Sequence, residues 1–303
     1  MFDILLKPLG FILQQLSYLF NGSFAASVFV FTIVINLLMI PLSIKSQKSS
    51  VAQMRIRPKL DALKKKYGDD RQKFAMAQQE LMQEEGVSMS GGCLPLLIRM
   101  PIMLGIYYVI LSPLKYLTNL SAETIAAAEA AFKNLNPSNA AYIQPEIINA
   151  VTNNKISFEG VAEVKQAVST IDFNFLGIDL TDKPVFNIDI FNEFKPSWWI
   201  PIIAFLAAML TSVFSMLMQK KNNPDAPSMG GLMLTMPLIS LFIGFTVSCA
   251  AGFYWACSSL ISGLIQLAVQ YFYGPNTMIA NEQKKELLKL HAEEQKKINS
   301  LNN

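Results

Sequence analysis

The sequence has few charged residues for its length. Asp, Glu, Lys and Arg make up 16% of the 303 residues, whereas a soluble domain usually has about 25%. Hydrophobic residues account for 52% of the chain. A composition so poor in charge and so rich in apolar side chains excludes an ordinary soluble domain. It indicates an integral membrane protein.

Residue types that commonly carry out catalysis are also scarce. The chain has one histidine, His291, and three cysteines, Cys93, Cys249 and Cys257, which lie in or beside apolar segments and form no CxxC pair. Cysteines in such surroundings usually serve as small core residues. The sequence contains no Walker-type glycine loop, no GxSxG and no HExxH. We therefore expect no catalytic site, no bound metal and no cofactor.

Five long apolar segments account for the low charge. Each is close to the roughly 20 residues that a helix needs to cross about 30 Å of hydrocarbon. We expect an all-α integral membrane protein with transmembrane helices at residues 24–44, 92–114, 198–218, 229–249 and 250–273. None of the five contains Asp or Glu. Proton- and sodium-coupled transporters usually carry such carboxylates inside the membrane, so their absence weighs against a transporter.

The distribution of positive charge predicts the orientation in the membrane. Ten Lys or Arg lie between residues 45 and 73, and the tail after the last apolar segment holds five Lys. Residues 115–197 contain ten Asp or Glu against six Lys. Because loops rich in Lys and Arg stay in the cytoplasm, we expect residues 115–197 and the N-terminus outside and the C-terminus inside. The segments expected in the cytoplasm are 45–91, 219–228 and 274–303.

Residues 1–23 are expected to form an amphipathic helix that lies in the membrane interface. Asp3, Lys7 and Pro8 interrupt the apolar run, which excludes the unbroken apolar core of a signal peptide. Apolar residues nevertheless recur at helical spacing, with polar residues between them. They are Phe2, Leu5, Leu9, Ile12, Leu16 and Leu19.

The segment 45–91 is predicted to form a helical hairpin. Two helical stretches flank "YGDD", where Asp69 or Asp70 can cap the second helix, and Gly86 is a suitable stop. The simpler interpretation is a solvated, basic orientation signal. About forty residues of patterned helix exceed what orientation requires, so a role in gating or in contacting a partner stays open as the alternative.

The segment 115–197 carries no pattern typical of an active site. Its sequence predicts short helices followed by irregular or extended structure. Trp198 and Trp199 mark the outer interface of the next span, as aromatic belts do. We assign this loop a packing and shielding role.

The apolar segments contain polar side chains that a span does not need. Arg99 is the most unusual, since a cation in hydrocarbon costs about 2.5–3.5 kcal/mol even on an insertion scale. Isolated Ser and Thr usually bond their own helix or help helices to pack, but Asn36, Arg99 and Gln266 are harder to explain in this way. Polar groups on several helices predict a wet cavity. The candidate groove residues are Asn36, Arg99, Thr211, Ser212, Ser215, Trp255, Ser258, Ser262 and Gln266.

Three segments resemble the signature regions of the YidC membrane protein insertases. They are "TIVINLLMIPLSIKSQKSSVAQMRIRPKL", "GGCLPLLIRMPIMLGIY" and "MPLISLFIGFTVSCAAGFYWACSSLISGLIQ". The superfamily includes mitochondrial oxidase-assembly and thylakoid insertases, and the absence of a large extra domain resembles the compact Gram-positive type. The resemblance covers nearly the whole chain outside the segment 115–197.

The resemblance implies a five-helix core in the bacterial plasma membrane that works without ATP. A hydrophilic groove would open to the cytosol and laterally to lipid, and would be closed toward the outside. The implied partners are nascent short-tailed membrane proteins and the lipid bilayer, with the Sec translocon and the ribosome as further candidates and no DNA. Two alternatives remain, a small-solute channel or transporter and a structural assembly factor for membrane complexes.

The chain departs from the family pattern at two positions in the groove. Many members have arginine at the position that Asn36 occupies, between Thr32 and Pro41, and glutamine where this chain has Arg99. At about 1.5 Å per residue, Asn36 lies roughly 13 Å from Lys45, and Arg99 roughly 10 Å from the boundary at residue 92. The two side chains are therefore expected at similar depth, with Arg99 supplying the charge of the groove. Alternatively, Arg99 snorkels to the headgroups.

Overall fold

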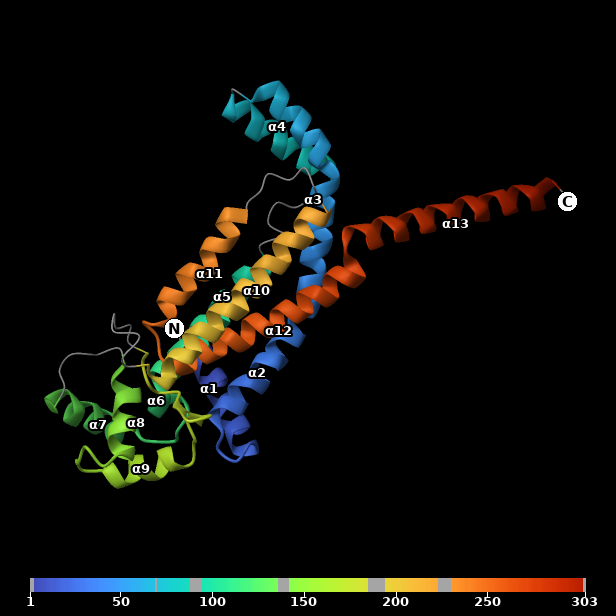
Figure 1. The fold of residues 1–303 in the computed structure, drawn as a ribbon. Helices are drawn as coiled ribbons and strands as arrows, with labels where there is room; N and C mark the ends of the chain where they lie inside the picture. The colour runs from blue at the N-terminus through green and yellow to red at the C-terminus, as the bar shows by residue number, and fades with distance from the viewer. Residues whose placement is uncertain are drawn as a thin grey trace. The chain divides into compact units, whose positions relative to one another are not determined.

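The chain is almost entirely helical. The computed structural model describes residues 3–68, 70–87, 94–135, 142–184, 194–222 and 230–301, and Figure 1 shows their elements. In this part of the chain the β-structure consists of two two-residue antiparallel strands and one isolated bridge. The prediction of an all-α integral membrane protein is confirmed.

The described elements follow one another along the chain with short connections. In chain order they are α1 Asp3–Leu19, α2 Phe24–Leu38, α3 Ile40–Tyr67, α4 Arg71–Glu84, α5 Leu94–Leu111, α6 Pro113–Tyr116, α7 Ala122–Leu135, α8 Ile143–Thr152, α9 Val161–Ser169, β1 Asn174–Phe175, β2 Ile178–Asp179, the 3-10 helix η2 Pro196–Trp198, α10 Trp199–Asn222, α11 Gly230–Gly244, α12 Cys249–Tyr273 and α13 Pro275–Leu301.

The elements form two compact units, which are described separately. The first comprises residues 1–38, 98–217 and 227–263. The second comprises residues 39–97, 218–226 and 264–303.

The described helices differ in how well they meet the length and composition of a membrane span. Residues Pro196–Met218 and Cys249–Tyr273 are long and apolar enough to cross a membrane. A third candidate arises if α2 and α3 count as one span across the break at Met39, and Met100–Leu111 is a shorter apolar helix. The expectation of five spans therefore stays a prediction.

The expected helix over 24–44 differs from the structure at its end. α2 ends at Leu38 and α3 begins at Ile40, with Pro41 in its first turn. Proline has no backbone N–H to donate to a preceding turn, but it fits the first turn of a new helix. The first helix therefore ends at Leu38, a few residues before the end of the apolar run at residue 44.

In the first unit, α1 packs along α2 by one apolar face. Leu6, Leu9 and Leu13 are buried in the same cluster as Phe24 and Val28 of α2. The predicted helix within residues 1–23 is thus present. Its other face exposes Ile4, Phe11, Ile12 and Tyr18, as an interfacial helix would. Its placement in the membrane interface remains a prediction.

Small residues hold α10, α11 and α12 close together. A Cβ atom at Gly252 of α12 would lie 2.8 Å from Ile200 Cγ2 at the start of α10, and one at Gly263 would overlap Thr211 Cγ2 further along both helices. The order of these contacts makes α10 and α12 parallel neighbours. At the end of α11, a Cβ atom at Gly244 would lie 2.9 Å from Cβ of Pro201. Such close approach is typical of helices that pack within a membrane.

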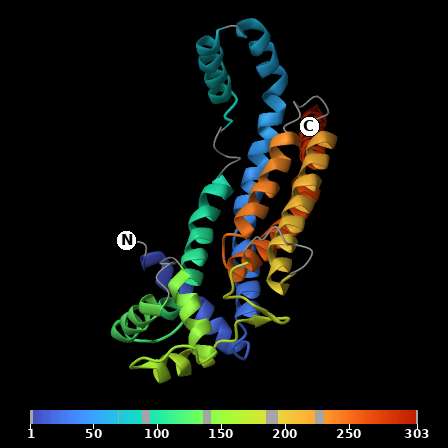
Figure 2. The same ribbon diagram turned by 60° about the vertical axis from the view of Figure 1, so that its left-hand side comes forward.

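Residues 113–135 and 142–184 form a small domain with its own core, here called the loop domain. Figure 2 shows its helices gathered beside one end of α5. Its core includes Leu114, Ala128, Phe132, Ile147, Val151 and Val164. The predicted short helices followed by extended structure are confirmed for the described residues.

The loop domain caps the first turns of two apolar helices. Phe24 N at the start of α2 donates to the carbonyl oxygen of Asp172 at 2.9 Å. At the start of α12, Cys249 N donates to the carbonyl of Asp182, and Ala250 N to that of Leu180, both at 2.8 Å. These bonds satisfy helix N–H groups that have no partner within their own helix.

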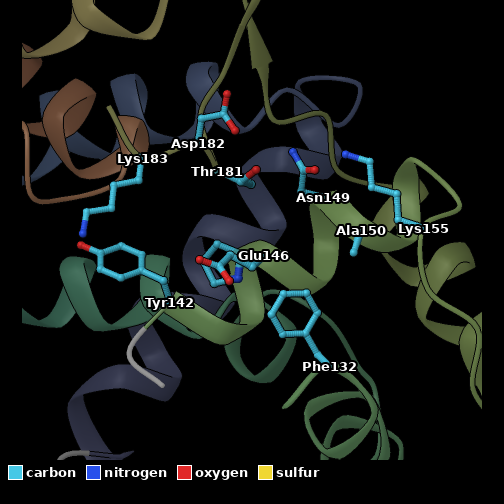
Figure 3. Close-up of a pocket in the computed structure, with 10 residues that line it drawn as sticks. Phe132, Tyr142, Glu146, Asn149, Ala150, Lys155, Thr181, Asp182 and Lys183 are labelled. Atoms are coloured by element: carbon cyan, nitrogen blue, oxygen red, sulfur yellow. The ribbon is translucent and has the colours of Figure 1, made fainter. Parts of the chain in front are cut away.

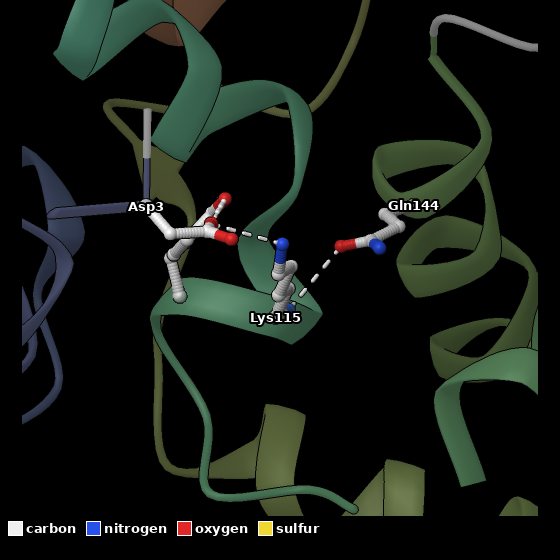
Figure 4. A network of polar contacts seen from close by, with 4 residues as sticks. Asp3, Lys115 and Gln144 are labelled. Carbon is white, nitrogen blue, oxygen red and sulfur yellow. Dashed lines mark hydrogen bonds and ion pairs between the residues drawn. The ribbon is translucent and has the colours of Figure 1, made fainter. Parts of the chain in front are cut away.

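A polar network ties the beginning of α1 to the loop domain (Figure 4). The Asp3 carboxylate accepts hydrogen bonds from Lys115 Nζ at 3.1 Å and from the Tyr116 hydroxyl at 2.6 Å. Lys115 N donates to Gln144 Oε1 at 3.3 Å, and Gln144 Nε2 donates to Glu129. Hydrogen bonds from Tyr116 and Lys115 lower the pKa of Asp3.

The second unit contains the expected helical hairpin. Asp70 caps α4 by accepting a hydrogen bond from Lys73 N at 3.1 Å, and Gly86 follows the helix with a left-handed φ of +63°. Lys59 of α3 forms an ion pair with Glu85 after α4. In the same unit, Lys48 lies 5.8 Å from the ring centre of Tyr273. The hairpin is therefore a defined structure and begins with the long helix α3.

The contact between α10 and α12 predicts the effect of Gly263→Ala. The new methyl group would collide with Thr211 Cγ2, so we expect a loss of about 1–3 kcal/mol in unfolding free energy. Thr211→Ser removes that methyl and should restore stability to Gly263→Ala. Unfolding in mixed micelles measures both effects, with Ser262→Ala as the neighbouring control. Additive losses in the double variant would contradict the contact.

The network at Asp3 predicts that the stability of α1 depends on pH in the acid range. Because the pKa of Asp3 is lowered in the folded protein, the network stabilises α1 fully above the unfolded value of about 3.9 and loses this contribution as the pH falls through the folded value. Proteolysis at the start of α1 should therefore accelerate below about pH 4. Asp3→Asn should show the faster rate already at pH 7 and lose the acid dependence, whereas Asp61→Asn should behave like the native protein.

Candidate functional site: buried polar residues and two cavities

Asn36 lies on the buried face of α2. It is 4% exposed, and Nδ2 donates to the Thr32 carbonyl oxygen at 2.8 Å. Thr32 is fully buried, and its hydroxyl donates to the carbonyl of Val28 at 2.6 Å. Polar side chains are thus stacked along the inner face of an otherwise apolar helix. Asn36 is thus buried, and its place in a groove stays a prediction.

The candidate residues of α10 differ in their surroundings. The hydroxyl of Thr211 donates to the carbonyl of Ala208 at 2.9 Å, while its methyl packs on Gly263. This geometry gives Thr211 a packing contact and a satisfied hydroxyl. Ser215, one turn further on, is 7% exposed, and Ser212 is half-buried.

On α12, the residues of the predicted polar stripe differ in burial. Ser258 is 7% exposed and forms no hydrogen bond with any described residue. Ser262 is half-buried and donates to the carbonyl of Ser259 at 3.2 Å. Gln266 is exposed and belongs to the second unit. Ser258 is therefore the stripe position whose hydroxyl remains available for water or for a substrate.

Trp255 lines an apolar cavity. The cavity has a volume of about 290 Å³ and lies between α5, the end of α11 and the beginning of α12. Its wall consists of Met103, Leu104, Tyr107, Ile110, Ile243, Thr246, Val247, Ala251, Tyr254 and Trp255. Trp255 thus faces mostly apolar neighbours.

Arg99 belongs to α5, but its side chain lies outside the described part of the structure. Its backbone is helical, and its neighbours Ile98 and Met100 are exposed. The expected depth and direction of the guanidinium therefore stay predictions.

A second cavity lies in the loop domain, where the sequence predicted packing and shielding alone (Figure 3). Its volume is about 330 Å³. The lining includes Tyr142, Glu146, Lys155, Asp182 and Lys183. The charged residues come from three separate segments, and only folding brings them together. The sequence of the segment 115–197 carries no pattern that pointed to this site.

Burial changes the titration of two groups at this second cavity. It raises the pKa of the Asp182 carboxyl, and the nearby Asp179 carboxylate adds to the shift. Burial also raises the pKa of the Tyr142 phenol, with a further contribution from its contact with Tyr107. Tyr142 is therefore a neutral hydrogen-bonding group at physiological pH. Among the described residues, no cluster of three or more His, Cys, Asp or Glu could hold a metal ion.

Several named relatives share substantial parts of the sequence. Membrane protein insertase YidC 1 of Listeria monocytogenes serotype 4b (strain F2365) is 28% identical over 259 residues, which cover 84% of this chain and 67% of the relative. Membrane protein insertase YidC of Alkalihalophilus pseudofirmus is 36% identical over 152 residues, covering 48% of this chain and 57% of the relative.

The similarity extends to longer proteins and to a family pattern. Membrane protein insertase YidC of Stutzerimonas stutzeri is 42% identical over 105 residues, which are 35% of this chain and 19% of the relative. Residues 16–276 match the family described as 60Kd inner membrane protein, and this match includes all the candidate groove residues. The chain therefore belongs to the 60Kd inner membrane protein family, to which the resemblance to YidC pointed.

Proposed function

We propose that the protein is a membrane protein insertase and chaperone of the bacterial plasma membrane. It would receive nascent short-tailed membrane proteins in a polar groove and release them laterally into lipid. The observation that carries the proposal is the burial of Asn36, Ser215 and Ser258 on three largely apolar helices, at positions within one compact unit. The insertase names of the relatives agree with it.

A groove of this kind lowers the barrier to moving a polar tail across the membrane. A polar segment in hydrocarbon loses its hydrogen bonds to water, and each unsatisfied backbone group costs several kcal/mol. Hydroxyl and amide side chains, together with the water they hold, replace part of that hydration. Arg99 would attract acidic residues of the tail, and this attraction is stronger in a low dielectric than in bulk water.

The remaining parts of the proposal follow from the distribution of charge and the fold. The acidic loop domain would lie outside and close the groove there, while the basic hairpin of α3 and α4 and the tail helix α13 would lie in the cytoplasm. The hairpin would contact or gate incoming substrates. α13 exposes Leu287, Leu288 and Leu290 among its charges, which would suit contact with the ribosome or the Sec translocon. No step of the proposed cycle needs ATP or a catalytic site.

A channel or coupled transporter is the alternative from another class. The sequence places no Asp or Glu in the five apolar segments, and coupled transport usually requires such groups. Purified protein in vesicles separates the two functions. We expect insertion of a short-tailed substrate without ATP, measured by protease protection, and no ion flux. Ion conduction without insertion would establish the channel instead.

The displaced positive charge predicts a specific rescue. Arg99→Gln should reduce insertion of clients with acidic tails, while clients with neutral tails should be affected less because they gain little from the cation. Adding Asn36→Arg should restore insertion by returning the cation to the family's usual helix. Arg99→Lys keeps the charge and serves as the matched control. Unchanged insertion of every acidic-tailed client by Arg99→Gln would refute this role.

A further inference from the structure

The polar cavity of the loop domain and the apolar cavity beside Trp255 meet at one tyrosine. Tyr142 lines the polar cavity, and its hydroxyl donates to the carbonyl oxygen of Thr246 at 3.0 Å and lies 3.5 Å from the Tyr107 hydroxyl. Tyr107 and Thr246 both line the apolar cavity. All of these residues belong to the first compact unit. A charged compartment therefore adjoins an apolar one, as the binding of an amphipathic ligand requires.

The charged groups of the polar cavity are not paired with one another. Glu146, Asp182 and Lys155 make no side-chain hydrogen bond or ion pair with any described residue, and Lys183 lies 4.9 Å from the ring centre of Tyr142. Figure 3 shows the two carboxylates between the two lysines. Their separation leaves two kinds of charge available, carboxylates for a cation and lysines for an anion.

The carboxylates are the groups of this cavity that accept a cation, and Lys155 and Lys195 offset part of the negative charge at Asp182. Asp179, which accepts hydrogen bonds from Thr181, adds a third negative charge near Asp182. A bound ammonium group would offset this repulsion and donate charge-assisted hydrogen bonds. Lys183 lies at Tyr142, the residue that adjoins the apolar cavity. It can therefore bind an anionic group that stands between the ammonium group and the apolar chain of a ligand.

We propose that the two cavities together bind one phospholipid with an amine-bearing zwitterionic headgroup. The ammonium group binds Glu146 and Asp182, the phosphate binds Lys183, and the first part of an acyl chain fills the cavity beside Trp255. The order of these groups along the ligand matches the order of the compartments across Tyr142. The apolar compartment lies between α5, α11 and α12, and two residues of its wall, Leu104 and Ile243, are exposed, so lipid reaches it from the leaflet nearest the loop domain.

The position of Trp255 allows a direct test. The chain has three tryptophans, so Trp198→Phe and Trp199→Phe leave Trp255 as the single emitter. The full-length protein is reconstituted in bilayers with increasing fractions of phosphatidylethanolamine, phosphatidylcholine or phosphatidylglycerol that carry brominated acyl chains, which quench tryptophan at contact. Half-maximal quenching by phosphatidylethanolamine should occur at about a fivefold lower lipid fraction than half-maximal quenching by phosphatidylcholine or phosphatidylglycerol. This difference is expected for one half-exposed charge-assisted hydrogen bond.

Charge variants then locate the headgroup. Glu146→Gln and Asp182→Asn should each remove the preference for the ethanolamine lipid, and Lys183→Gln should weaken quenching by all three lipids. Glu159→Gln, an exposed carboxylate of the same domain, should change nothing. Circular dichroism and the unfolding midpoint verify that each variant is folded.

Two results would overturn the proposal. Equal quenching by the three brominated lipids would mean ordinary contact with surrounding lipid. Crosslinking of the translocated tail of a client from a photoreactive group at position 146, combined with absence of any lipid preference, would assign the cavity to the client instead.

Discussion

The backbone N–H groups in the first turns of α2 and α12 need partners that their own helices do not provide. Hydrocarbon offers none, and each unsatisfied group costs several kcal/mol. The loop domain supplies them through the carbonyl oxygens of Asp172, Leu180 and Asp182. Because these carbonyls belong to one folded domain, the beginnings of α2 and α12 are held in a fixed relation to each other. The packing of the first unit depends on this arrangement.

The first unit differs in polarity between the capped ends of its helices and the regions further along them. At the capped end, fully buried Phe24, Leu180 and Cys249 belong to one apolar cluster. Further along the helices, Asn36, Ser215 and Ser258 are buried polar residues. Water held at these positions would lack a path through the apolar cluster. This order of residues along each helix supports the proposed groove that opens to one side only.

Much of the fold was accessible from the sequence because it depends on local patterns. The apolar runs, the cap at Asp70 and the stop at Gly86 define helices within a few residues, and the structure contains them. The break at Met39 was missed because the apolar run continues through it, and the proline at position 41 fits either a kink or a new first turn. Their polarity within apolar segments marked Asn36 and Ser258 as groove candidates; both are buried, and their place in a groove stays a prediction.

The sequence was uninformative where function depends on distant segments. Nothing in the segment 115–197 indicated that Glu146, Lys155 and Lys183 converge, since their spacing follows no helical or strand period. The apolar surroundings of Trp255 likewise depend on residues of α5 and α11. The hydroxyls of Thr211 and Ser262 bond their own helix backbone, and composition alone does not distinguish such satisfied hydroxyls from ones that are left for water.

The one-sided groove is tested most directly by thiol accessibility from each side of the membrane. Ser258→Cys and Ser262→Cys, in a background without the three native cysteines, are exposed to a membrane-impermeant maleimide in oriented vesicles. The account predicts that both positions react from the side of the membrane opposite the loop domain and are protected from the side of the loop domain. Equal reaction from both sides would contradict closure by the loop domain, and reaction from neither side would contradict a wet groove.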